Sequence, residues 1–482
     1  MRDRIKQLEE LSRSLDPNAQ ERGQWLQKVV QYTDAFLDQL KTVPVYRANP
    51  EAGPGLFSAP ISEDPLDMDR VLGLIRDNID AAGVNVGSGG WLAYIPGSGL
   101  YASALADYIA AITNRYPTIY FASPGVVSMD RLLLAWVAEW IGYPKEAAGD
   151  MTSGGSIANL IGIVTARDAQ GLQAKDFSKA VVYLSQQTHH SVDKALRIAG
   201  LGEAVKRQVP LDERYRMNPA ALEREILQDK KAGLIPWLLI PSAGTTDTGA
   251  VDPLAAMAEI TQAHKLWLHV DGAYGAAFML CAEGRKILQG LERSDSMVID
   301  PHKGLFIPFG SGMVLVRDGK KLLKSFYYEA SYLQDSDTLA SPDEVSPCDL
   351  SPELTRHFRA LRLWLPLKLI GLAPFRAALE EKMLLARYFH ERLRELDGFW
   401  VGSEPDLSIV VFRYIPKQGN VDEFNQRLIK AVQEDGRVFI SSTLIDGRFT
   451  LRMAALNFRT HLDRMDLLIQ VLREKVKEIE KE

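Results

Sequence analysis

The sequence predicts an α/β protein whose central, mostly parallel sheet is covered by helices on both faces. Short apolar runs at residues 181–184, 237–240 and 267–270 are typical of buried strands. Helix-like segments such as residues 254–264 separate such runs, as the crossover connections of a parallel sheet require. Polar residues follow each run directly, so we expect them at the carboxyl ends of the strands, where open α/β sheets bind ligands.

The length of the chain predicts more than one structural unit. With 482 residues it exceeds one average hydrophobic core. We expect an N-terminal helical arm at residues 1–86, a large domain at 87–375 and a small C-terminal α/β domain at 376–482. The proportions of hydrophobic residues (46%) and charged residues (24%) are ordinary for a folded globular chain and exclude a disordered one.

Charge and cysteine content exclude several classes of function. The net charge of −6 gives no basic surface for nucleic acid or an anionic membrane. The two cysteines, Cys281 and Cys348, favour a reducing compartment over a disulfide framework and lack metal-ligand spacing. No apolar run is long enough to cross a membrane, and the first residues are charged. We expect a cytoplasmic protein without a metal site.

The first 45 residues predict two amphipathic helices. Ile5, Leu8 and Leu11 recur at helical spacing, residues 16–18 interrupt the pattern, and apolar residues resume it from Trp25. Such an arm has too little core of its own, so we expect it to pack on another surface, such as a second subunit. The Pro- and Gly-rich stretch that follows, to residue 66, is expected to be extended.

Glycine-rich turns at residues 87–90 and 97–99 precede apolar helix-like segments. Neither turn completes the dinucleotide-binding fingerprint after a strand, so we interpret both as structural turns. The aromatic residues Trp91, Tyr94 and Phe121 lie in the same region. Side chains of this kind line a pocket or belong to the core, and the sequence leaves both interpretations open.

The stretch Thr-Ser-Gly-Gly-Ser at residues 152–156 is a candidate phosphate site. It leads directly into an apolar helix at 157–167, so that backbone N–H groups, a hydroxyl and the helix dipole would all face an anion. The alternative is an ordinary helix start with Ser156 as its capping residue.

Two further strand ends carry residues suited to a ligand. His189 follows the strand at 181–184, where its ring can lie on a planar cofactor or remain a surface loop side chain. Small hydroxyl residues follow the strand at 237–240, and they allow a ligand to approach closely.

The most informative residues are Asp271 and Lys303. Asp271 ends the strand at 267–270, and Lys303 follows another β-like run at 297–299, on what we expect to be a turn rather than a helix. A carboxylate and an amine at neighbouring strand ends suit a cofactor that needs a covalent amine anchor and an anionic partner for a ring nitrogen, as pyridoxal 5′-phosphate (PLP) does. The alternative for these two residues alone is a structural ion pair.

The motifs together resemble the group II PLP-dependent amino acid decarboxylases, the family of the aromatic L-amino acid and glutamate decarboxylases. The resemblance covers essentially the whole chain and implies PLP fold type I, the architecture of aspartate aminotransferase. It is carried, in order and spacing, by Thr-Ser-Gly-Gly-Ser-Ile-Ala-Asn at 152–159, Thr-His at 188–189, Gly-Thr-Thr at 244–246, His-Val-Asp-Gly-Ala-Tyr at 269–274 and Asp-Pro-His-Lys at 300–303.

The resemblance implies a role for each matching residue. Lys303 would carry the cofactor as an internal aldimine, Asp271 would keep the ring nitrogen protonated, and His189 would stack on one face of the ring. The resemblance also implies that Ala273 would contact the other face of the ring and that Thr246 would lie beside the ring. It implies contacts with the phosphate by Gly155, Ser156 and His302.

The expected reaction is decarboxylation of an L-amino acid to its amine and carbon dioxide, through a quinonoid intermediate. The polar segment 327–345 contains Tyr332, which resembles the family's proton donor; the alternative is a packed loop tyrosine. Because family members with phenylalanine there make aldehydes, tyrosine favours the amine. An aldehyde synthase, an aminotransferase and a catalytically silent binding partner remain the alternatives.

Substrate identity depends on a region that departs from the family. Trp91, Tyr94, Ile95 and Thr118 are the candidate substrate contacts, and Thr118 stands where aromatic decarboxylases have phenylalanine. The apolar lining favours an aromatic or other bulky apolar amino acid. Asp300 replaces the asparagine of those enzymes, and its charge argues against direct contact with a phosphate. The resemblance also implies a homodimer whose N-terminal arm and Tyr332 loop cross the interface.

Overall fold

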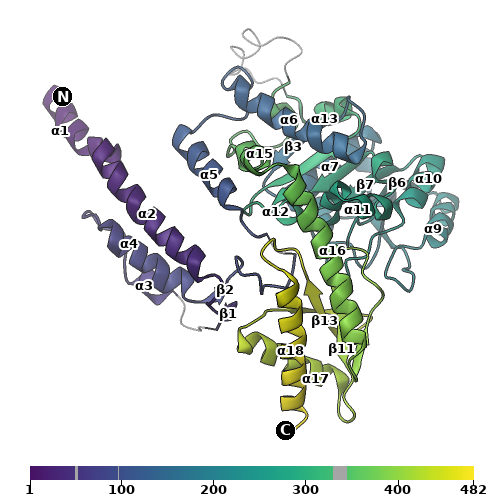
Figure 1. The fold of residues 1–482 in the computed structure, drawn as a ribbon. Helices are drawn as coiled ribbons and strands as arrows, with labels where there is room; N and C mark the ends of the chain where they lie inside the picture. The colour runs from purple at the N-terminus through teal and green to yellow at the C-terminus, as the bar shows by residue number, and fades with distance from the viewer. Residues whose placement is uncertain (49–52, 96, 329–344, 482) are drawn as a thin grey trace.

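A seven-stranded sheet forms the centre of the computed structural model, which describes residues 1–48, 53–95, 97–328 and 345–481 (Figure 1). Its strands, in spatial order, are β3 (Ala148–Thr152), β9 (Gly312–Val316), β8 (Ser296–Ile299), β7 (Trp267–Asp271), β6 (Ile235–Leu239), β4 (Ala180–Leu184) and β5 (Val205–Gln208). Strands β8 to β5 are mutually parallel, whereas β9 runs antiparallel to both of its neighbours. The predicted α/β fold with a mostly parallel sheet is confirmed.

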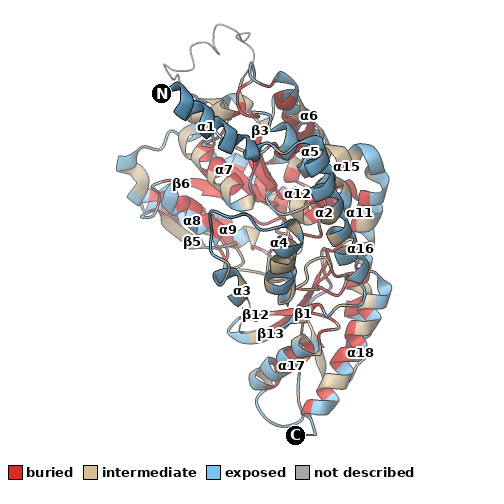
Figure 2. Ribbon diagram, turned by 90° about the vertical axis from the view of Figure 1, so that its left-hand side faces the viewer, coloured by how far each residue is buried: buried red, intermediate tan, exposed pale blue. Residues whose placement is uncertain are grey.

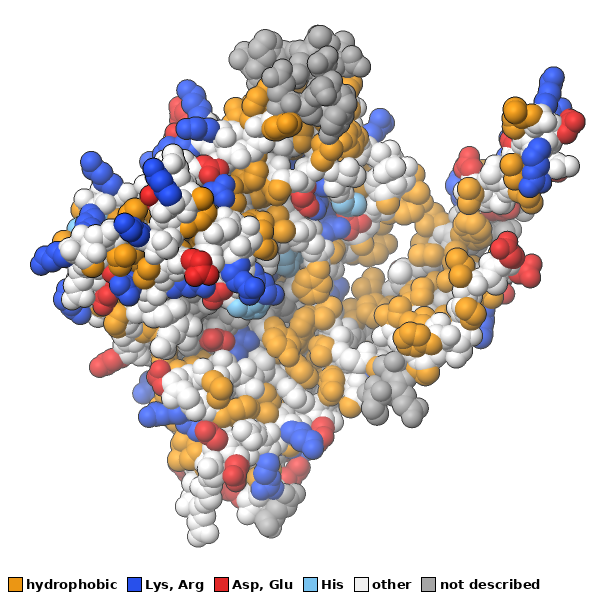
Figure 3. Space-filling model, turned by 180° about the vertical axis from the view of Figure 1, so that it is seen from behind, with side chains coloured by type: hydrophobic (Ala, Val, Ile, Leu, Met, Phe, Trp, Pro, Cys, Tyr) orange, Lys and Arg blue, Asp and Glu red, His pale blue; other side chains and the backbone are white. Residues whose placement is uncertain are grey.

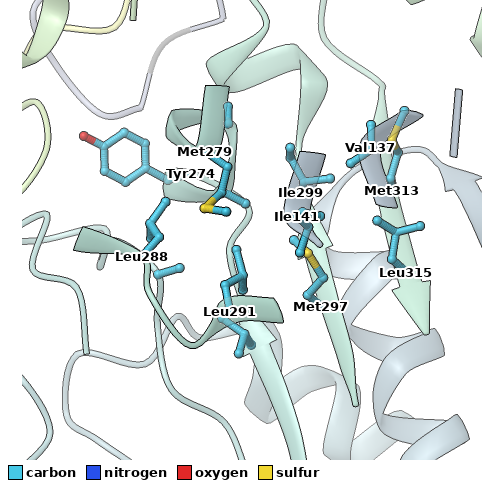
Figure 4. Close-up of a cluster of buried hydrophobic side chains, with 14 of the residues drawn as sticks. Val137, Ile141, Tyr274, Met279, Leu288, Leu291, Met297, Ile299, Met313 and Leu315 are labelled. Atoms are coloured by element: carbon cyan, nitrogen blue, oxygen red, sulfur yellow. The ribbon is translucent and has the colours of Figure 1, made fainter. Parts of the chain in front are cut away.

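Helices cover both faces of this sheet because alternate side chains of each strand point to opposite sides. On β8, Met297 and Ile299 join one buried cluster and Val298 joins the other. Figure 4 shows part of the first cluster, in which side chains of α6 lie beside those of β8 and β9. The helices of this region are α5 (Tyr101–Thr113), α6 (Pro124–Ile141), α7 (Gly155–Ala169), α8 (Ser191–Ile198), α9 (Pro219–Lys231), α10 (Leu254–His264), α11 (Ala282–Ile287), α12 (Pro301–Gly304) and α13 (Gly319–Phe326).

The C-terminal part has its own antiparallel sheet and its own buried cluster. The sheet order is β10 (Phe399–Val401), β11 (Ile409–Tyr414), β13 (Arg448–Ala454) and β12 (Ser441–Ile445), and the helices are α16 (Leu372–Arg394), α17 (Val421–Asp435) and α18 (Leu462–Ile479). The helix before them, α15 (Arg359–Ile370), packs on α5 and α6 and belongs to the main buried cluster. Figure 2 shows buried residues on the strands and on the inward faces of the helices. The helix expected from residue 376 begins earlier because Gly371, at φ 80°, separates it from α15.

The N-terminal arm contains the two predicted helices, α1 (Arg2–Ser12) and α2 (Ala19–Gln39), followed by α3 (Pro54–Phe57) and α4 (Met68–Ile75). Asn18 lies between them and caps α2, since its side chain accepts hydrogen bonds from the backbone N–H groups of Gln20 and Glu21. The short helix α3 corrects the expectation of a wholly extended stretch. Strand β1 (Tyr46–Arg47) pairs antiparallel with β2 (Gly83–Val84) below the arm.

The arm stands apart from the body of the chain (Figure 1), and Figure 3 shows hydrophobic side chains along it and on the body nearby. Trp25 is 45% exposed, and α1 and α2 have no buried residue. Most of the apolar face that the sequence predicted is therefore exposed within one chain. None of the helices in the described ranges is both long and apolar enough to cross a membrane.

A buried ionic cluster joins α6, β3 and the segment before α15. Arg356 donates hydrogen bonds to Asp130 and Asp150, and all three side chains are at most 4% exposed. Burial raises the pKa of Asp130 to about 7, against the opposing effect of Arg356. The guanidinium therefore compensates two carboxylates that water does not reach.

We expect Arg356→Ala to lower the free energy of unfolding by roughly 3–5 kcal/mol, because it leaves two buried carboxylates without a cation. Urea unfolding followed by circular dichroism measures this change. The control is Arg224→Ala on the exposed side of α9, for which we expect a change within about 0.5 kcal/mol. Equal stability of the two variants would contradict the assignment.

Candidate active site

A cavity of about 400 Å³ opens at the carboxyl ends of the parallel strands. Residues that follow β3, β4, β6, β7 and β8 line it, as the position of ligand sites in open α/β sheets predicts. The cavity brings together all the residues predicted to contact the cofactor, which are Gly155, Ser156, His189, Thr246, Asp271, Ala273, His302 and Lys303.

Asp271 ends β7, and its carboxylate is held in place from two sides. Oδ2 accepts a hydrogen bond from Asn159 Nδ2 at 3.2 Å, and Oδ1 accepts one from the backbone N–H of Ala273 at 3.2 Å. The residue is only 8% exposed, yet it lines the cavity. These two hydrogen bonds hold both carboxylate oxygens in place at the wall of the cavity.

Lys303 lies on α12, a single helical turn that starts with Pro301 after β8. The expectation of a turn rather than a helix is wrong here, because Pro301 at the first helical position favours helical geometry. The ammonium Nζ lies 3.1 Å from Asp300 Oδ2, and the lysine side chain is 23% exposed. Asp300 is 2% exposed, and its Oδ1 has no hydrogen-bond partner among the described residues.

The glycine-rich turn between β3 and α7 lets backbone come close to the cavity. A Cβ atom on Gly155 would lie 2.9 Å from Asp300 Oδ2 and 3.2 Å from the Cβ of Ala273. Gly154 has φ 155°, a conformation that residues with a side chain rarely adopt. The start of α7 therefore points its free N–H groups and the positive end of its dipole toward the cavity, which favours an anion.

Two histidines of the cavity are held neutral. Burial lowers the pKa of His189, whose Nδ1 lies 2.8 Å from Ser191 Oγ. Burial also lowers the pKa of His302, whose Nδ1 donates a hydrogen bond to the carbonyl of Ser311. Neutral imidazoles offer a flat ring and one N–H donor without adding charge.

These residues fit PLP. The group needs an amine to bond its aldehyde, an acceptor for its ring N–H and an anion site for its phosphate. Lys303, Asp271 and the start of α7 supply the three in one cavity. Buried polar atoms that find no partner among the described residues, Gln187 Oε1 and Asp300 Oδ1, also belong to residues that line it.

None of the predicted substrate contacts is among the described residues that line this cavity. The backbone carbonyls of Tyr94 and Thr246 both accept from Arg452 Nη2, so Tyr94 lies near one cavity residue. Trp91 is 6% exposed and packs with Val45 and Phe439, and Thr118 is fully buried. Ile95 is partly buried against the main core, whereas Tyr94 is 57% exposed and has φ 55°. Their role in substrate binding stays a prediction. Tyr332 lies outside the described residues.

The cavity also contains polar residues to which the sequence analysis assigned no role, which are Asn159, Gln187, Ser191, Ser242 and Thr245. Ser242 and Thr245 belong to the stretch of hydroxyl residues after β6. Their position at a strand end was the signal that could have predicted their place in the cavity. Asn159 and Ser191 lie within the helices α7 and α8. In a helix, periodicity shows that a position is buried, but it does not distinguish a polar residue that faces a cavity from one that lies in the core.

Comparison with known proteins agrees with this geometry. A family model, described as the pyridoxal-dependent decarboxylase conserved domain, matches residues 50–415. The aromatic-L-amino-acid decarboxylase of Bacillus atrophaeus is 32% identical over 474 residues, which are 97% of this chain and 98% of that protein. The phenylacetaldehyde synthase of Petunia hybrida is 30% identical, over 91% of this chain and 92% of that protein. A crystal structure of Oryza sativa TDC with PLP and tryptamine is 26% identical and has a TM-score of 0.90, over 96% of this chain and 99% of that chain.

The fold and the cavity are those of a PLP-dependent enzyme of fold type I. More specifically, the chain belongs to the pyridoxal-dependent decarboxylase family. The resemblance inferred from the motifs is confirmed, and so is the expected cofactor, PLP.

Proposed function

We propose that this decarboxylase converts an aromatic L-amino acid to its amine and carbon dioxide. The observation that carries the proposal is the single cavity that contains the Lys303 amine, the Asp271 carboxylate and the glycine turn of α7. The names of the similar Bacillus atrophaeus and Oryza sativa proteins, an aromatic-L-amino-acid decarboxylase and tryptophan decarboxylases, support the substrate class.

The residues of the cavity take roles that follow from their chemistry. Bound PLP supplies an aldehyde that reacts with amines and a protonated ring that withdraws electrons from the substrate Cα. Lys303 would provide the amine that anchors this group, and Asp271 would keep the proton on its ring nitrogen. His189 would cover one face of the ring.

The remaining cofactor contacts surround these three. Ala273 would face the ring from the side opposite His189, and Thr246 would lie beside it. Gly155 and Ser156 would hold the phosphate through N–H and hydroxyl donors, with the His302 ring in contact with it. Support for the last assignment comes from the close approach of Gly155 to the cavity wall and from the His302 ring near Gly154, where an added Cβ would lie 3.4 Å from its Cε1.

Replacement of Lys303 by alanine should abolish decarboxylation while leaving the fold intact, because the cofactor loses its covalent anchor. The measurement is carbon dioxide release from tryptophan, tyrosine, phenylalanine and, for comparison, glutamate. We expect the unaltered protein to prefer the aromatic substrates. Lys320→Ala, at an exposed lysine of α13, is the control. Activity of the Lys303 variant equal to that of the control would exclude this lysine, and preference for glutamate would exclude the aromatic class.

The product is the second point of the proposal. The petunia relative at 30% identity is named an aldehyde synthase, so the same fold and a similar sequence accompany a different product. Tyr332, placed by its sequence resemblance alone, is our candidate for the donor that protonates the substrate Cα and thereby directs the reaction to the amine.

We expect Tyr332→Phe to shift product from amine toward aldehyde, since the variant has no phenolic proton to deliver. Chromatographic measurement of both products with one aromatic substrate tests this expectation. Tyr328→Phe, at a nearby tyrosine that is 82% exposed, is the matched control. An unchanged ratio of amine to aldehyde in the Tyr332 variant would remove this residue from the mechanism.

We also propose that the protein is a cytoplasmic homodimer whose N-terminal arm packs on the partner subunit. The exposed apolar side chains of α1 and α2 support the dimer, because helices with so little buried surface are not stable alone. The two free cysteines, Cys281 and Cys348, support a reducing compartment.

Sedimentation equilibrium should give twice the chain mass of 53.7 kDa. The double substitution Trp25→Glu and Leu26→Glu should shift the protein toward the monomer, because charges on the apolar face of α2 oppose its burial. As a control, Trp400→Glu introduces the same charge at a tryptophan of the body that is 41% exposed. A monomeric unaltered protein would contradict the proposed dimer.

A further inference from the structure

The buried amide of Asn159 lies directly behind the candidate cofactor contacts. It is part of α7 and is 1% exposed. Its Nδ2 lies 3.2 Å from Asp271 Oδ2 and 3.3 Å from Ser191 Oγ, and its Oδ1 lies 2.9 Å from His269 Nε2. One side chain therefore contacts three polar groups on β7 and α8.

The direction of these hydrogen bonds follows from the Asp271 carboxylate, whose oxygens can only accept. The NH₂ group of Asn159 therefore faces Asp271 and Ser191, and its Oδ1 faces His269 Nε2. Burial lowers the pKa of His269 to about 4, so the ring carries one proton, which must be on Nε2 because Asn159 Oδ1 can only accept.

The core of the sheet agrees with this orientation. With the proton on Nε2, His269 Nδ1 accepts from the Ser296 hydroxyl at 2.7 Å, and Ser296 Oγ accepts from the Trp267 indole N–H at 2.8 Å. Both hydrogens of the Asn159 amide are used, one for a carboxylate and one for a hydroxyl.

The second branch continues from Ser191 to His189. Because Ser191 Oγ accepts from Asn159, its own hydrogen is free to donate to His189 Nδ1 at 2.8 Å. The backbone N–H of Ser191 also donates to this nitrogen, at 3.2 Å. The His189 ring therefore keeps its proton on Nε2 and is oriented by Ser191.

We propose that Asn159 is a positioning residue that orients the Asp271 carboxylate directly and the His189 ring through Ser191. The inference rests on the proposed function, in which these two residues hold the ring nitrogen and one face of the cofactor ring. One amide on α7 then sets both contacts, so that the ring nitrogen partner and the stacking ring keep a fixed geometry relative to each other.

Two substitutions separate the functions of the amide. Asn159→Leu removes the donors and the acceptor with little change in size. Asn159→Asp keeps an acceptor for His269 but turns a second carboxylate toward Asp271, which opposes the charge that Asp271 must keep. Ser191→Ala breaks only the branch to His189. Thr165→Val is the control, because the Thr165 hydroxyl is buried in the same helix and bonds only the carbonyl of Ile161.

The readouts are the PLP dissociation constant of the full-length apoprotein, from fluorescence titration, and the visible circular dichroism of bound PLP. Thermal unfolding without PLP reports the fold separately. We expect Asn159→Leu to raise the dissociation constant by about tenfold or more, as loss of a hydrogen bond to a buried charged group implies. Asn159→Asp should raise it further.

The branch to His189 gives a second expectation. Ser191→Ala should change the circular dichroism of bound PLP with a smaller loss of affinity, and adding it to Asn159→Leu should cause no further change. Thr165→Val should leave both readouts unaltered even where it lowers the unfolding temperature.

Three results would overturn the inference. One is an affinity of the Asn159 variants within twofold of the unaltered protein, and another is an equal loss in Thr165→Val. If Asn159→Leu does not fold, an unaltered circular dichroism signal in Ser191→Ala and an unaltered affinity in Asn159→Asp would decide against it. An unaltered protein that binds no PLP would instead overturn the proposed function, and the inference with it.

Discussion

The carboxylate of Asp271 is kept at the end of β7 by a buried amide on one side and a backbone N–H on the other. The backbone of the same residue continues the sheet, since its N–H donates to the carbonyl of Pro241 and its carbonyl accepts from Ala243. The charge therefore cannot move without disturbing the strand ends. The other cavity residues lie around this fixed negative charge.

The charges of the cavity are arranged so that each has a partner or a use. Asp300 is nearly fully buried and pairs with the Lys303 ammonium at 3.1 Å. An uncompensated Asp300 carboxylate would repel a phosphate at the neighbouring glycine turn. The Lys303 ammonium compensates this charge, which gives a physical reason why a carboxylate is tolerated there. The histidines stay neutral through burial, so they add no further charge.

Much of this organisation was predictable from local patterns. Short apolar runs gave the parallel strands, and the helix at residues 254–264 matches α10 at both ends. His189, Asp271 and Lys303 were found because ligand groups in such sheets follow strand ends, a rule that needs only the chain order. The family resemblance supplied Thr246, Ala273 and His302, and the interruption at residues 16–18 separated α1 from α2.

Other features depend on contacts between distant parts of the chain and escaped prediction. The one-turn helix that carries Lys303 is too short to show periodicity. Trp91 resembles a pocket residue by its glycine neighbours, yet it packs against Phe439, which lies 348 residues further along the chain. The role proposed for Asn159 depends on its hydrogen bonds with Asp271, His269 and Ser191, which the fold brings together.

The central claim, that the ends of β7 and β8 form one PLP site, is tested most directly by reduction of the PLP-loaded protein with borohydride. Peptide mapping by mass spectrometry then locates the pyridoxyl group. The account predicts a single labelled lysine, Lys303. A label on another lysine, or none after saturation with PLP, would contradict it.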